Sequence, residues 1–464
     1  MNRRRKYAAF QTGLKPFKRS IEPEWLYGAA RTRGLSCAAT VEIEKNITIT
    51  EGVSPMSDVV IVSGCRTAIG EFGGTLRDVH AAKISSVPMK AAIDRAGISP
   101  DIIDDVRFGC CLNPTDAMNV TRIGALIAGI PDTVPAVTIN RVCISGMEAV
   151  LSGAAMIKAG VANVILAGGV EHMSGVPFTL EKARWGVRMG NETITDAMQT
   201  GLHCGSHILT YPDDGPFEFF RGKPYIMGHT AEFVAAKCGI TRQEQDEIAL
   251  RSHNSVERAT NDGSFSEEIV PVTIPQKKGA PKIFDKDEHF RPGLTMEALA
   301  KLSPAFIPKT GTVTAGNSSG INDGSAALII MSEDRARTDG LKPLARIKAV
   351  GMGACNPTVM GLSPIPAVHN LLNRSGMSLD DFELIELNEA FAAQYLACER
   401  ELKLNREITN VNGSGIGLGH PVGCTGARLI VSLIYAMKKR NKSLGLATLC
   451  GGGGVSMACA IEMV

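Results

Sequence analysis

The sequence contains no long hydrophobic run and no excess of charge of one sign. No apolar stretch reaches the ~20 residues that a membrane-spanning helix needs, so we predict no membrane span. The 49 Lys and Arg nearly balance the 47 Asp and Glu, and the formal net charge is only +2. This balance gives no electrostatic reason to expect a nucleic-acid partner. Together these absences are typical of an ordinary soluble globular protein.

Cysteine is not scarce, but it lacks the arrangement of a metal site or a disulfide framework. No Cys-x-x-Cys pair recurs with the spacing of a zinc site, so we predict no structural metal. Twelve cysteines scattered through 464 residues do not resemble the dense framework of a small secreted domain. We therefore expect free thiols in a reducing compartment, and a cytoplasmic protein.

Residues 1–55 show no strong periodicity and differ from the remaining chain. The first 20 residues carry seven Lys or Arg and no acid, as transit peptides do, and a mitochondrial location follows if the segment is one. Met56, however, begins the stretch MSDVVIVSGCRTAIG, which looks like a complete start that runs directly into a strand. We expect residues 1–55 to be a disordered, targeting or misassigned extension, and the fold to begin near Ser57.

The remaining chain repeats itself, and this repetition predicts the architecture. Residues 91–109 (AAIDRAGISPDIIDDVRFG) and 370–388 (NLLNRSGMSLDDFELIELN) share a helical pattern, a glycine, a helix start with acids and an apolar strand. Residues 142–160 and 422–440, at nearly the same offset, each open an apolar helix with a glycine-containing turn. Each of these two helices leads into an apolar strand. Three echoes in register indicate a duplication.

Strands that alternate with helices in this way favour an α/β fold with buried, mostly parallel strands. We predict two similar halves, at 57–178 and 343–464, in which mixed, mostly parallel sheets are sandwiched by helices. The halves should pack about a pseudo-twofold axis. Residues 179–300 are richer in Gly, Pro and charge, and we expect them to form a loop or lid insertion. The chain then returns to the first half until about residue 340.

Cys143 begins a helix of the first half, in NRVCISGMEAV, and His420 occupies the equivalent turn of the second half, in GHPVGCTG. If the two helix starts meet at the pseudo-twofold axis, the thiol and the imidazole lie close together. A helix N-terminus and a neighbouring histidine both lower the pKa of a thiol. The thiolate is the nucleophilic form, so we predict that Cys143 is an activated nucleophile. For Cys110, Cys111 and Cys424 we favour the alternative of a buried structural cysteine.

Cys450 is the second exceptional cysteine, because it ends the strand GLATLC and precedes four glycines, Gly451 to Gly454. A thiol in this position can act as an acid or base, and backbone N–H groups freed by glycines can point at an oxyanion. A glycine run also fits a phosphate-binding loop. Neither GGGG nor GSGIGLG (413–419) follows the G-x-G-x-x-G pattern, however, so we do not favour a dinucleotide site.

Five stretches resemble, in order, the successive motifs of the thiolase family: NRVCISGMEAV, VTAGNSSGINDGSAA, ELNEAFAAQ, VNGSGIGLGHPVGCTGAR and LCGGGGVSMA. The stretches QEQDEIALRS and FDKDEHFRPG also fit, and the resemblance runs from about Met56 to Val464. It implies the duplicated thiolase-like fold. It also implies an acyltransferase that forms or cleaves a carbon–carbon bond between acyl groups held as coenzyme A (CoA) thioesters. No metal or redox cofactor is implied, because the CoA thioesters are substrates.

The resemblance implies a role for each residue of the site. Cys143 would accept the acyl group while His420 takes its proton. Cys450 would remove a proton from the methyl carbon of a second acetyl-CoA, or return it in the cleavage direction. Asn388 would hold a water that forms one oxyanion hole with His420, and the N–H groups of Cys143 and Gly452 would form the other. Such a layout suits a Claisen condensation, and an acyl-enzyme that forms first implies ping-pong kinetics.

Positions that contact CoA follow from the same resemblance. Ser319 and Ala315 match positions beside the pantetheine arm, and Met227 matches a side chain that lines the acyl pocket. Arg291 matches a position near the nucleotide, with a solvated surface arginine as its alternative. The remaining histidines of this region are expected to be surface or satisfied polar residues: His229, His253 and His289.

The acyl chain length stays open at this level. Ile144 follows the nucleophile where the family usually has a small residue, and Ile226 stands where short-chain biosynthetic members typically have histidine. The loop at 201–224 is also longer than expected. We predict an acetyl-CoA C-acetyltransferase, with a longer-chain β-oxidation 3-ketoacyl-CoA thiolase as the alternative.

Two further alternatives concern the chemistry itself. A decarboxylating ketoacyl synthase generally pairs its cysteine with two histidines, whereas this chain has Cys450 at the second base position. A noncatalytic thiolase-like scaffold has no need for the quartet of Cys143, Asn388, His420 and Cys450. The family habit finally implies a homodimer or homotetramer whose ligands are acyl-CoA and CoA.

Overall fold

One mixed β-sheet organises the protein, whose computed structural model describes residues 58–208 and 223–464. These residues belong to a single compact unit, Ser54–Val464. The extension predicted at residues 1–55 lies outside the described residues. No helix in the described part of the chain is long and apolar enough to cross a membrane.

The main sheet has the strand order β13-β14-β15-β12-β1-β11-β5-β3-β4. The strands of the first half are β1 (Val59–Thr67), β3 (Asp105–Gly109), β4 (Ala136–Ile139), β5 (Val164–His172) and β11 (Asn322–Ser332). Those of the second half are β12 (Ala345–Ala354), β13 (Leu384–Leu387), β14 (Leu444–Gly451) and β15 (Val455–Met463). The short strands β2 (Gly70–Glu71) and β8 (Ile269–Val270) pair with β11 and β1.

The two halves repeat one strand arrangement. In the first half, β3 and β5 are parallel, and β11 runs antiparallel to both β5 and β1. In the second half, β13 and β14 are parallel, and β15 runs antiparallel to both β14 and β12. The halves join where β1 and β12 pair, through Val60 with Arg346 and Ile61 with Ala345. This correspondence confirms the predicted duplication.

The sheet is mixed, as predicted, but its longest ladders are antiparallel, and the expectation of mostly parallel strands is wrong in this respect. Parallel pairs are those whose strands are linked through helices, such as β3 with β5 and β13 with β14. By contrast, β15 follows β14 through a tight turn, and β11 returns from the insertion. The helix–strand pattern of the sequence identifies crossover connections, whereas an antiparallel hairpin needs no helix.

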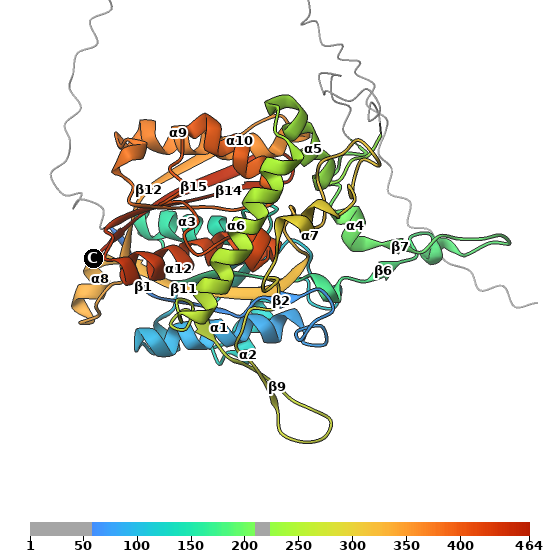
Figure 1. The fold of residues 1–464 in the computed structure, drawn as a ribbon. Coiled ribbons are helices and arrows are strands. Elements are labelled where there is room, and N and C mark those ends of the chain that lie inside the picture. Colours follow the sequence, from blue (N-terminus) through green and yellow to red (C-terminus); the bar gives the residue numbers. More distant parts are fainter. Residues whose placement is uncertain (1–57, 209–222) are drawn as a thin grey trace, which may run out of the picture. The chain divides into compact units, whose positions relative to one another are not determined.

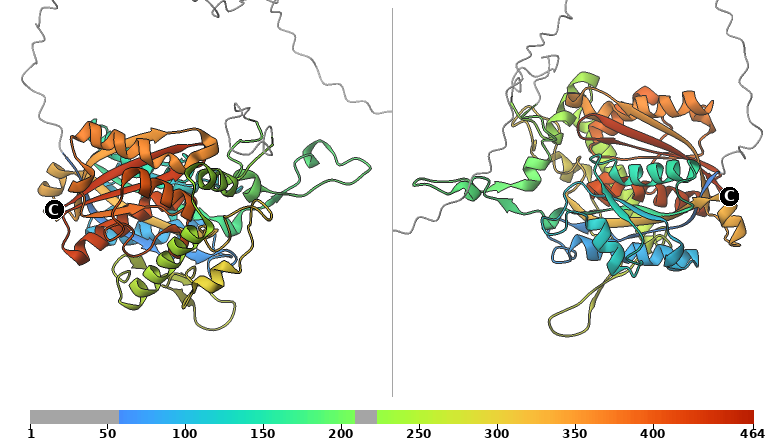
Figure 2. Two further views of the ribbon diagram at one scale, coloured as in Figure 1. Left: turned by 45° about the horizontal axis from the view of Figure 1, so that its top comes forward. Right: turned by 180° about the vertical axis from the view of Figure 1, so that it is seen from behind.

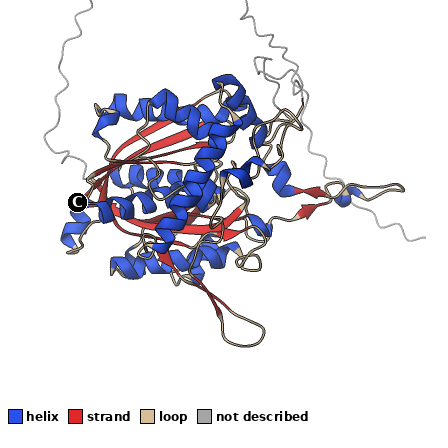
Figure 3. Cartoon of the chain, in the orientation of Figure 1, coloured by secondary structure: helices blue, strands red, loops and turns tan. Residues whose placement is uncertain are grey.

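Helices and strands alternate in layers (Figures 1 and 3). The central layer consists of α3 (Ser145–Lys158) and α12 (Val422–Arg440), which pack against each other and against strands of both halves. The first half is covered on its outer side by α1 (Ala81–Ala96) and α2 (Val120–Ile127). The second half is covered by α9 (Pro364–Ser375) and α10 (Ala392–Leu402).

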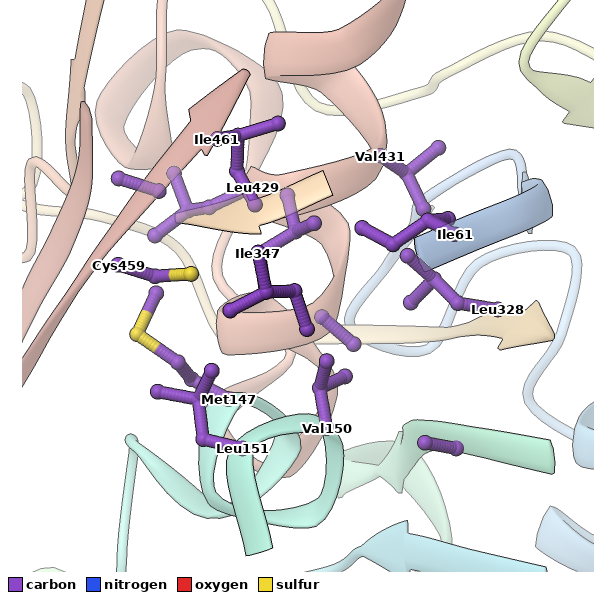
Figure 4. Packing of buried hydrophobic residues seen from close by; sticks show 14 of the residues in the cluster. Ile61, Met147, Val150, Leu151, Leu328, Ile347, Leu429, Val431, Cys459 and Ile461 are labelled. Carbon is purple, nitrogen blue, oxygen red and sulfur yellow. The ribbon is translucent and has the colours of Figure 1, made fainter. Parts of the chain in front are cut away.

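The central hydrophobic core lies around α3 and α12 (Figure 4). Met147 and Val150 of α3 and Leu429 of α12 pack with Leu328 of β11 and Ile461 of β15, and all five side chains are buried. Burial of each such side chain contributes about 1.5–3 kcal/mol to stability. The core therefore fixes the two central helices to both halves at once.

The two central helices begin in backbone contact. A Cβ atom on Gly146 would lie only 2.8 Å from the carbonyl oxygen of Gly423, so glycine is needed for this close approach. The expected meeting of two helix starts at the centre of the duplication is therefore present in the fold.

The segment predicted as an insertion contains short strands and several helices. An arm formed by β6 (Phe178–Thr179) and β7 (Thr195–Asp196) extends away from the layers (Figures 1 and 2). The helices that follow are α4 (Ala197–Gly201), α5 (Met227–Cys238), α6 (Arg242–Asn261) and α7 (Met296–Ala300), with β9 (Val272–Ile274) and β10 (Lys282–Phe284) between the last two. Elsewhere the chain adds α8 (Glu333–Thr338) and α11 (Gly415–Leu418). The exact limits of the halves and of the lid stay predictions.

A buried ion network fixes part of the insertion to the first half. The Arg66 guanidinium of β1 contacts the carboxylates of Glu268 at 2.6 Å and Asp287 at 2.7 Å, and all three side chains are almost completely buried. Removing one partner would leave an uncompensated buried charge, which costs about 3–5 kcal/mol. The network therefore explains why these acidic residues lie inside the fold and not on its surface.

Candidate active site

Cys143 lies in a tight turn between β4 and α3, two residues before the helix begins. Val142 has a φ of 52°, in the left-handed region that a β-branched residue rarely adopts. Asn140 Oδ1 accepts a hydrogen bond from the Val142 N–H at 3.0 Å. The Val142 carbonyl accepts from Ser145 Oγ at 2.5 Å and from Cys111 Sγ at 3.0 Å. Neighbouring side chains thus hold a strained turn in place, as is common at functional positions.

The Cys143 thiol is half-buried and packs in an apolar cluster with Met173, Met198, Leu202 and Val422. The backbone N–H of Gly452 hydrogen-bonds its sulfur and favours the thiolate. Burial has the larger effect, however, and raises the pKa of Cys143 to about 12. The predicted lowering of this pKa is therefore wrong for the free protein, because desolvation outweighs the effect of nearby N–H groups. The resting thiol is protonated at neutral pH and needs a base.

His420 supplies a neutral base in a defined tautomer. Its Nδ1 lies 2.7 Å from Thr425 Oγ, and the Thr425 hydroxyl donates to the Pro421 carbonyl at 2.9 Å. Since the hydroxyl proton is already used, Thr425 accepts from Nδ1–H, and Nε2 is the unprotonated nitrogen that acts as an acceptor. Burial lowers the pKa of His420 to about 3, with the Arg428 guanidinium as a further cause. The imidazole is therefore neutral at every ordinary pH.

Asn388 follows β13 and lies beside this imidazole. Its Nδ2 is 3.5 Å from His420 Nε2, and its backbone N–H donates to the Thr448 carbonyl at 3.0 Å. Asn388 Oδ1 is buried and has no protein partner among the described residues. An orphaned acceptor beside an unprotonated imidazole nitrogen is chemically suited to bind a small polar group.

Cys450 occupies the end of β14 and is completely buried. It pairs across the hairpin with Ser456 of β15 and packs in a second apolar cluster with Met227, Phe306 and Phe391. Burial raises its pKa well above the usual range, and the neighbouring Cys143 sulfur adds to this effect. The two thiols are thus close enough to influence each other electrostatically.

A buried carboxylate joins the nucleophile turn to the start of α12. Glu171, at the end of β5, accepts from the N–H groups of Cys111 at 2.9 Å, Leu112 at 3.0 Å and Gly423 at 2.8 Å. Burial raises its pKa, while these N–H groups lower it. Because Cys111 belongs to the first half and Gly423 to the second, Glu171 holds the two halves together at the site.

The predicted residues therefore fall into two contact groups. Cys143, Cys450 and Gly452 form one group, and His420 and Asn388 form the other. Among the described residues, the hydrogen bonds of the His420 ring go to Asn388 and Thr425 and not to Cys143. Val422, two residues after His420, packs in the Cys143 cluster and links the two groups.

The predicted CoA positions are distributed unevenly. The Met227 sulfur would lie 3.2 Å from a Cβ on Gly452, so Met227 borders the site. Ser319 donates its backbone N–H to the carbonyl of Ala390 at 3.0 Å, and Ala390 lies two residues after Asn388. Ala315 is exposed. Arg291 is half-exposed, pairs with Glu71 and shares no recorded contact with the catalytic residues, so its role stays a prediction.

Sequence reasoning missed three residues that act on the site. Thr425 lies inside the quoted motif GHPVGCTG, but nothing in the sequence shows that its hydroxyl reaches His420. Cys111 has a structural role, as predicted, but nothing in the sequence shows that its thiol supports the strained turn. Cys204 approaches Gly452 from the insertion, and the only signal was the unusual length of its loop. The contacts of Cys111 and Cys204 are long-range, and that of Thr425, although local, has no pattern that the sequence reveals.

The described residues contain no group of three or more His, Cys, Asp or Glu that could hold a metal ion. The chemistry of the site is instead that of two thiols, one neutral imidazole and one amide. This set can form a thioester, accept a proton and bind an oxyanion.

Comparison with known proteins identifies the family. The model described as "Thiolase, N-terminal domain" matches residues 59–334, and that described as "Thiolase, C-terminal domain" matches residues 341–463. The chain belongs to the thiolase family. The predicted family, the predicted duplicated α/β fold and the predicted class of enzyme, a thiolase acyltransferase, are thereby confirmed.

Characterised relatives and solved structures agree with this assignment. The chain is 45% identical to an acetyl-CoA acetyltransferase of Cupriavidus necator, over 88% of this thiolase and 100% of the relative. It is 48% identical to one of Syntrophomonas wolfei, over 87% and 99%. A crystal structure of the Bacillus anthracis acetyl-CoA acetyltransferase superposes with a TM-score of 0.82 at 46% identity, covering 88% and 100%. Human mitochondrial 3-ketoacyl-CoA thiolase gives a TM-score of 0.81 at 37% identity, covering 89% and 100%.

Proposed function

We propose that this thiolase is an acetyl-CoA C-acetyltransferase, which reversibly condenses two acetyl-CoA molecules to acetoacetyl-CoA and CoA. The observation that carries the proposal is the pair of neighbouring thiols, half-buried Cys143 and buried Cys450, with the Gly452 N–H hydrogen-bonded to the first. The names of the similar bacterial relatives support acetyl-CoA as the substrate. A preference for longer chains and a noncatalytic role are not favoured.

In the cleavage direction, the Cys143 sulfur attacks the 3-keto carbonyl of acetoacetyl-CoA, and its proton passes to His420 Nε2. The tautomer of His420 supports this role, because the bond from Nδ1–H to Thr425 leaves Nε2 as the nitrogen that can accept a proton. Catalytic hydrogen bonds often tighten only when substrate is bound, so the partners of His420 in the free protein do not oppose it.

The carbon–carbon bond between C2 and C3 then breaks. The acetyl group stays on Cys143, and the electron pair stays on C2 of the departing acetyl-CoA, where Cys450 supplies the proton. CoA next attacks the acetyl-Cys143 thioester, gives its thiol proton to Cys450, and leaves as the second acetyl-CoA while His420 returns the proton to Cys143. The condensation direction reverses these steps, with Cys450 as the base at the methyl carbon.

Two oxyanion sites complete the proposed mechanism. The N–H groups of Cys143 and Gly452 would stabilise the oxyanion at the nucleophile, and the hydrogen bond from Gly452 to the Cys143 sulfur supports this placement. Asn388 and His420 would stabilise the other thioester oxygen through a water, which the unpartnered Asn388 Oδ1 could hold. We further propose that Ser319, Ala315, Met227 and Arg291 contact CoA, and that no metal or redox cofactor takes part.

We also propose that the protein forms a homodimer or homotetramer. The β6–β7 arm exposes Phe178, Trp185, Met189 and Ile194, and exposed apolar side chains of this size favour contact with another surface. A second copy of the chain is the proposed partner. The proposed compartment is the cytoplasm, or the mitochondrion if residues 1–55 act as a transit peptide.

The test is acylation followed by turnover. The purified protein should acquire one acetyl group from acetyl-CoA, peptide mapping should place it on Cys143, and added CoA should remove it. Acetoacetyl-CoA with CoA should yield two molecules of acetyl-CoA with parallel-line ping-pong kinetics. A protein that turns over acetoacetyl-CoA without acetylated Cys143 would disprove the nucleophile assignment, and a protein with neither reaction would disprove the function.

A further inference from the structure

Cys204 lies in the turn after α4 and reaches the centre of the site. Its φ is 46°, in the left-handed region, and Gly205 follows with a φ of 80°. The Cys204 sulfur lies only 2.4 Å from the position that a Cβ on Gly452 would occupy. Since the Gly452 N–H is the donor to the Cys143 sulfur, Cys204 stands directly beside the proposed oxyanion site.

Two other side chains close the same face of Gly452. The Val142 Cγ1 atom would lie 3.1 Å from a Cβ on Gly452, and the Met227 sulfur 3.2 Å from it. Val142 comes from the nucleophile turn and Met227 from α5, whereas Cys204 comes from the loop that is longer than expected. The face of Gly452 therefore has three walls, of which Cys204 is the nearest.

Cys204 also lies close enough to the proposed nucleophile, Cys143, to affect it electrostatically. After burial, the neighbouring Cys204 sulfur is the next strongest cause of the raised Cys143 pKa. Met198 of α4 and Leu202, which belong to the same segment as Cys204, pack in the apolar cluster that contains Cys143. One segment of the insertion thus covers the nucleophile, and Cys204 is its member closest to the oxyanion donor.

We propose that Cys204 limits the length of the acyl group that Cys143 can carry, which restricts this thiolase to short-chain substrates. The inference rests on the proposed function and names the substrate class of that site. An acyl carbonyl on Cys143 with its oxygen on the Gly452 N–H places the next carbon beside Gly452. An acetyl group ends there in a methyl, whereas every longer acyl group adds methylenes in the space that Cys204 borders.

The expected change in chain-length selectivity follows from the free-energy cost of fitting one extra methylene into the pocket. A pocket that is one methylene too small discriminates by roughly 10- to 200-fold in kcat/KM. Cys204→Ala removes one sulfur atom, which is comparable in size to a methylene. The space gained accommodates one of the two methylenes by which the butyryl group from the C6 3-ketoacyl-CoA exceeds acetyl, so the C6:C4 ratio of kcat/KM should rise roughly tenfold. Cys204→Leu should lower that ratio below the wild-type value, because it adds bulk to the same wall.

The experiment is thiolysis by the purified full chain of 3-ketoacyl-CoA substrates from C4 to C10, with CoA as the second substrate. Cys204→Ser, which nearly preserves size, should leave the C6:C4 ratio within about twofold of wild type. Cys238→Ala is the matched control, because Cys238 is another half-buried cysteine and ends α5 without contact to Cys143 in the described structure. It should also leave the ratio unchanged.

The outcomes separate this inference from the proposed function. An unchanged C6:C4 ratio in both Cys204→Ala and Cys204→Leu, or equal losses for all chain lengths, would overturn the role of Cys204 as a wall. Equal losses would mean that Cys204 only supports the fold of its loop. Absence of thiolysis at every length in the wild-type protein would instead refute the proposed function, and would do so before any variant is made.

Discussion

The two cysteines of the site are neighbours, but the chain presents them in different ways. Cys143 lies in a strained turn that Asn140, Ser145 and Cys111 hold through side-chain hydrogen bonds. Cys450 lies at the end of a regular strand, and the ladder between β14 and β15 holds it, while the hydroxyl of its cross-strand partner Ser456 donates to the Leu449 carbonyl at 2.7 Å. A nucleophile must meet a carbonyl carbon in one precise geometry, whereas an acid or base needs only proton-transfer distance. The two modes of support match these two demands.

The same difference appears in the surroundings of the thiols. Cys143 packs against α4 of the insertion and receives the Gly452 N–H, so an anion formed there has a donor ready. Cys450 is surrounded by apolar side chains, and burial keeps its thiol protonated until substrate arrives. The comparison is consistent with the proposed roles of Cys143 in acyl transfer and of Cys450 in proton transfer. Variants that separate these two steps test it.

Cys143→Ala should have the largest effect. Without a sulfur to accept the acetyl group, neither acylation nor turnover is possible, and kcat/KM should fall on the order of 10⁴-fold or more. Intact-protein mass spectrometry after incubation with acetyl-CoA should show no adduct. Cys65→Ala is a control, because Cys65 is also buried but its thiol hydrogen-bonds the Pro88 carbonyl at 3.3 Å and not a residue of the nucleophile turn. If Cys143→Ala still formed an acetyl adduct, the two cysteines would have exchanged roles.

Cys450→Ala should separate acetylation of Cys143 from proton transfer at the methyl carbon. Acetylation of Cys143 needs no proton transfer at the methyl carbon, and without the Cys450 proton CoA can still leave as a thiolate. The adduct should therefore still form, although more slowly, while condensation and cleavage should fall roughly 10²- to 10⁴-fold. Exchange of the acetyl methyl hydrogens with deuterated water, measured by mass spectrometry, should stop. Loss of acetylation together with turnover would contradict the division of labour between the two thiols.

Thr425→Val should have a smaller effect that acts through His420. The variant keeps the volume but removes the acceptor of the Nδ1–H, so the imidazole loses its fixed tautomer. Loss of a buried hydrogen bond costs ~1–3 kcal/mol, which corresponds to roughly 5- to 150-fold in kcat. The pH profile of kcat should change as well, because the tautomer and the pKa of His420 both change.

Thr425→Ser provides the rescue, since a serine hydroxyl can accept from Nδ1 in the same way. Near-wild-type kcat in the serine variant and reduced kcat in the valine variant would establish the hydroxyl as the positioning group. Equal loss in both would show that the threonine methyl group and its packing matter instead, and would remove Thr425 from the account of His420.

The sequence was sufficient to predict the duplication, and it also proposes which residues carry chemistry, because both leave local patterns. Repeated helix–strand segments indicate the two halves, and motifs identify Cys143, His420 and Cys450 by position. Strand direction was predicted less well. The turn at Gly451–Gly454 allows β15 to return antiparallel to β14, and the periodicity of the strands themselves carries no information on direction.

Electrostatics and the walls of the site could not be predicted in the same way. The pKa of Cys143 depends on how far its thiol is desolvated, and desolvation arises from residues distant in sequence, such as Met198 and Val422. The approach of Cys204 to Gly452 joins positions in different halves of the chain. Contacts of this kind follow from packing and not from any local pattern.

The smallest expected effect is a change in the free energy of unfolding when another buried histidine is replaced. It tests whether burial alone can lower a histidine pKa in this protein, as inferred for His420. His253 of α6 lies away from both thiols, yet burial lowers its pKa to about 4, with His289 and Arg291 as further causes. Its Nδ1 accepts the Arg291 N–H at 3.1 Å, which is a bond that a glutamine side chain can replace. His253→Gln therefore removes the titrating group while it keeps the hydrogen bond.

The stability of the wild-type protein should depend on pH because folded and unfolded His253 bind a proton at different pH values. An unfolded histidine takes up a proton below pH ~6.5, whereas folded His253 stays neutral down to about pH 4, so stability falls as the pH falls through this window. Between pH 7 and pH 5 the wild-type protein should lose roughly 2 kcal/mol of unfolding free energy more than His253→Gln loses. Urea unfolding at both pH values and a fixed protein concentration measures the difference. Equal losses would mean that folded His253 is protonated by pH 5, and burial alone would then not explain the neutral imidazole at His420.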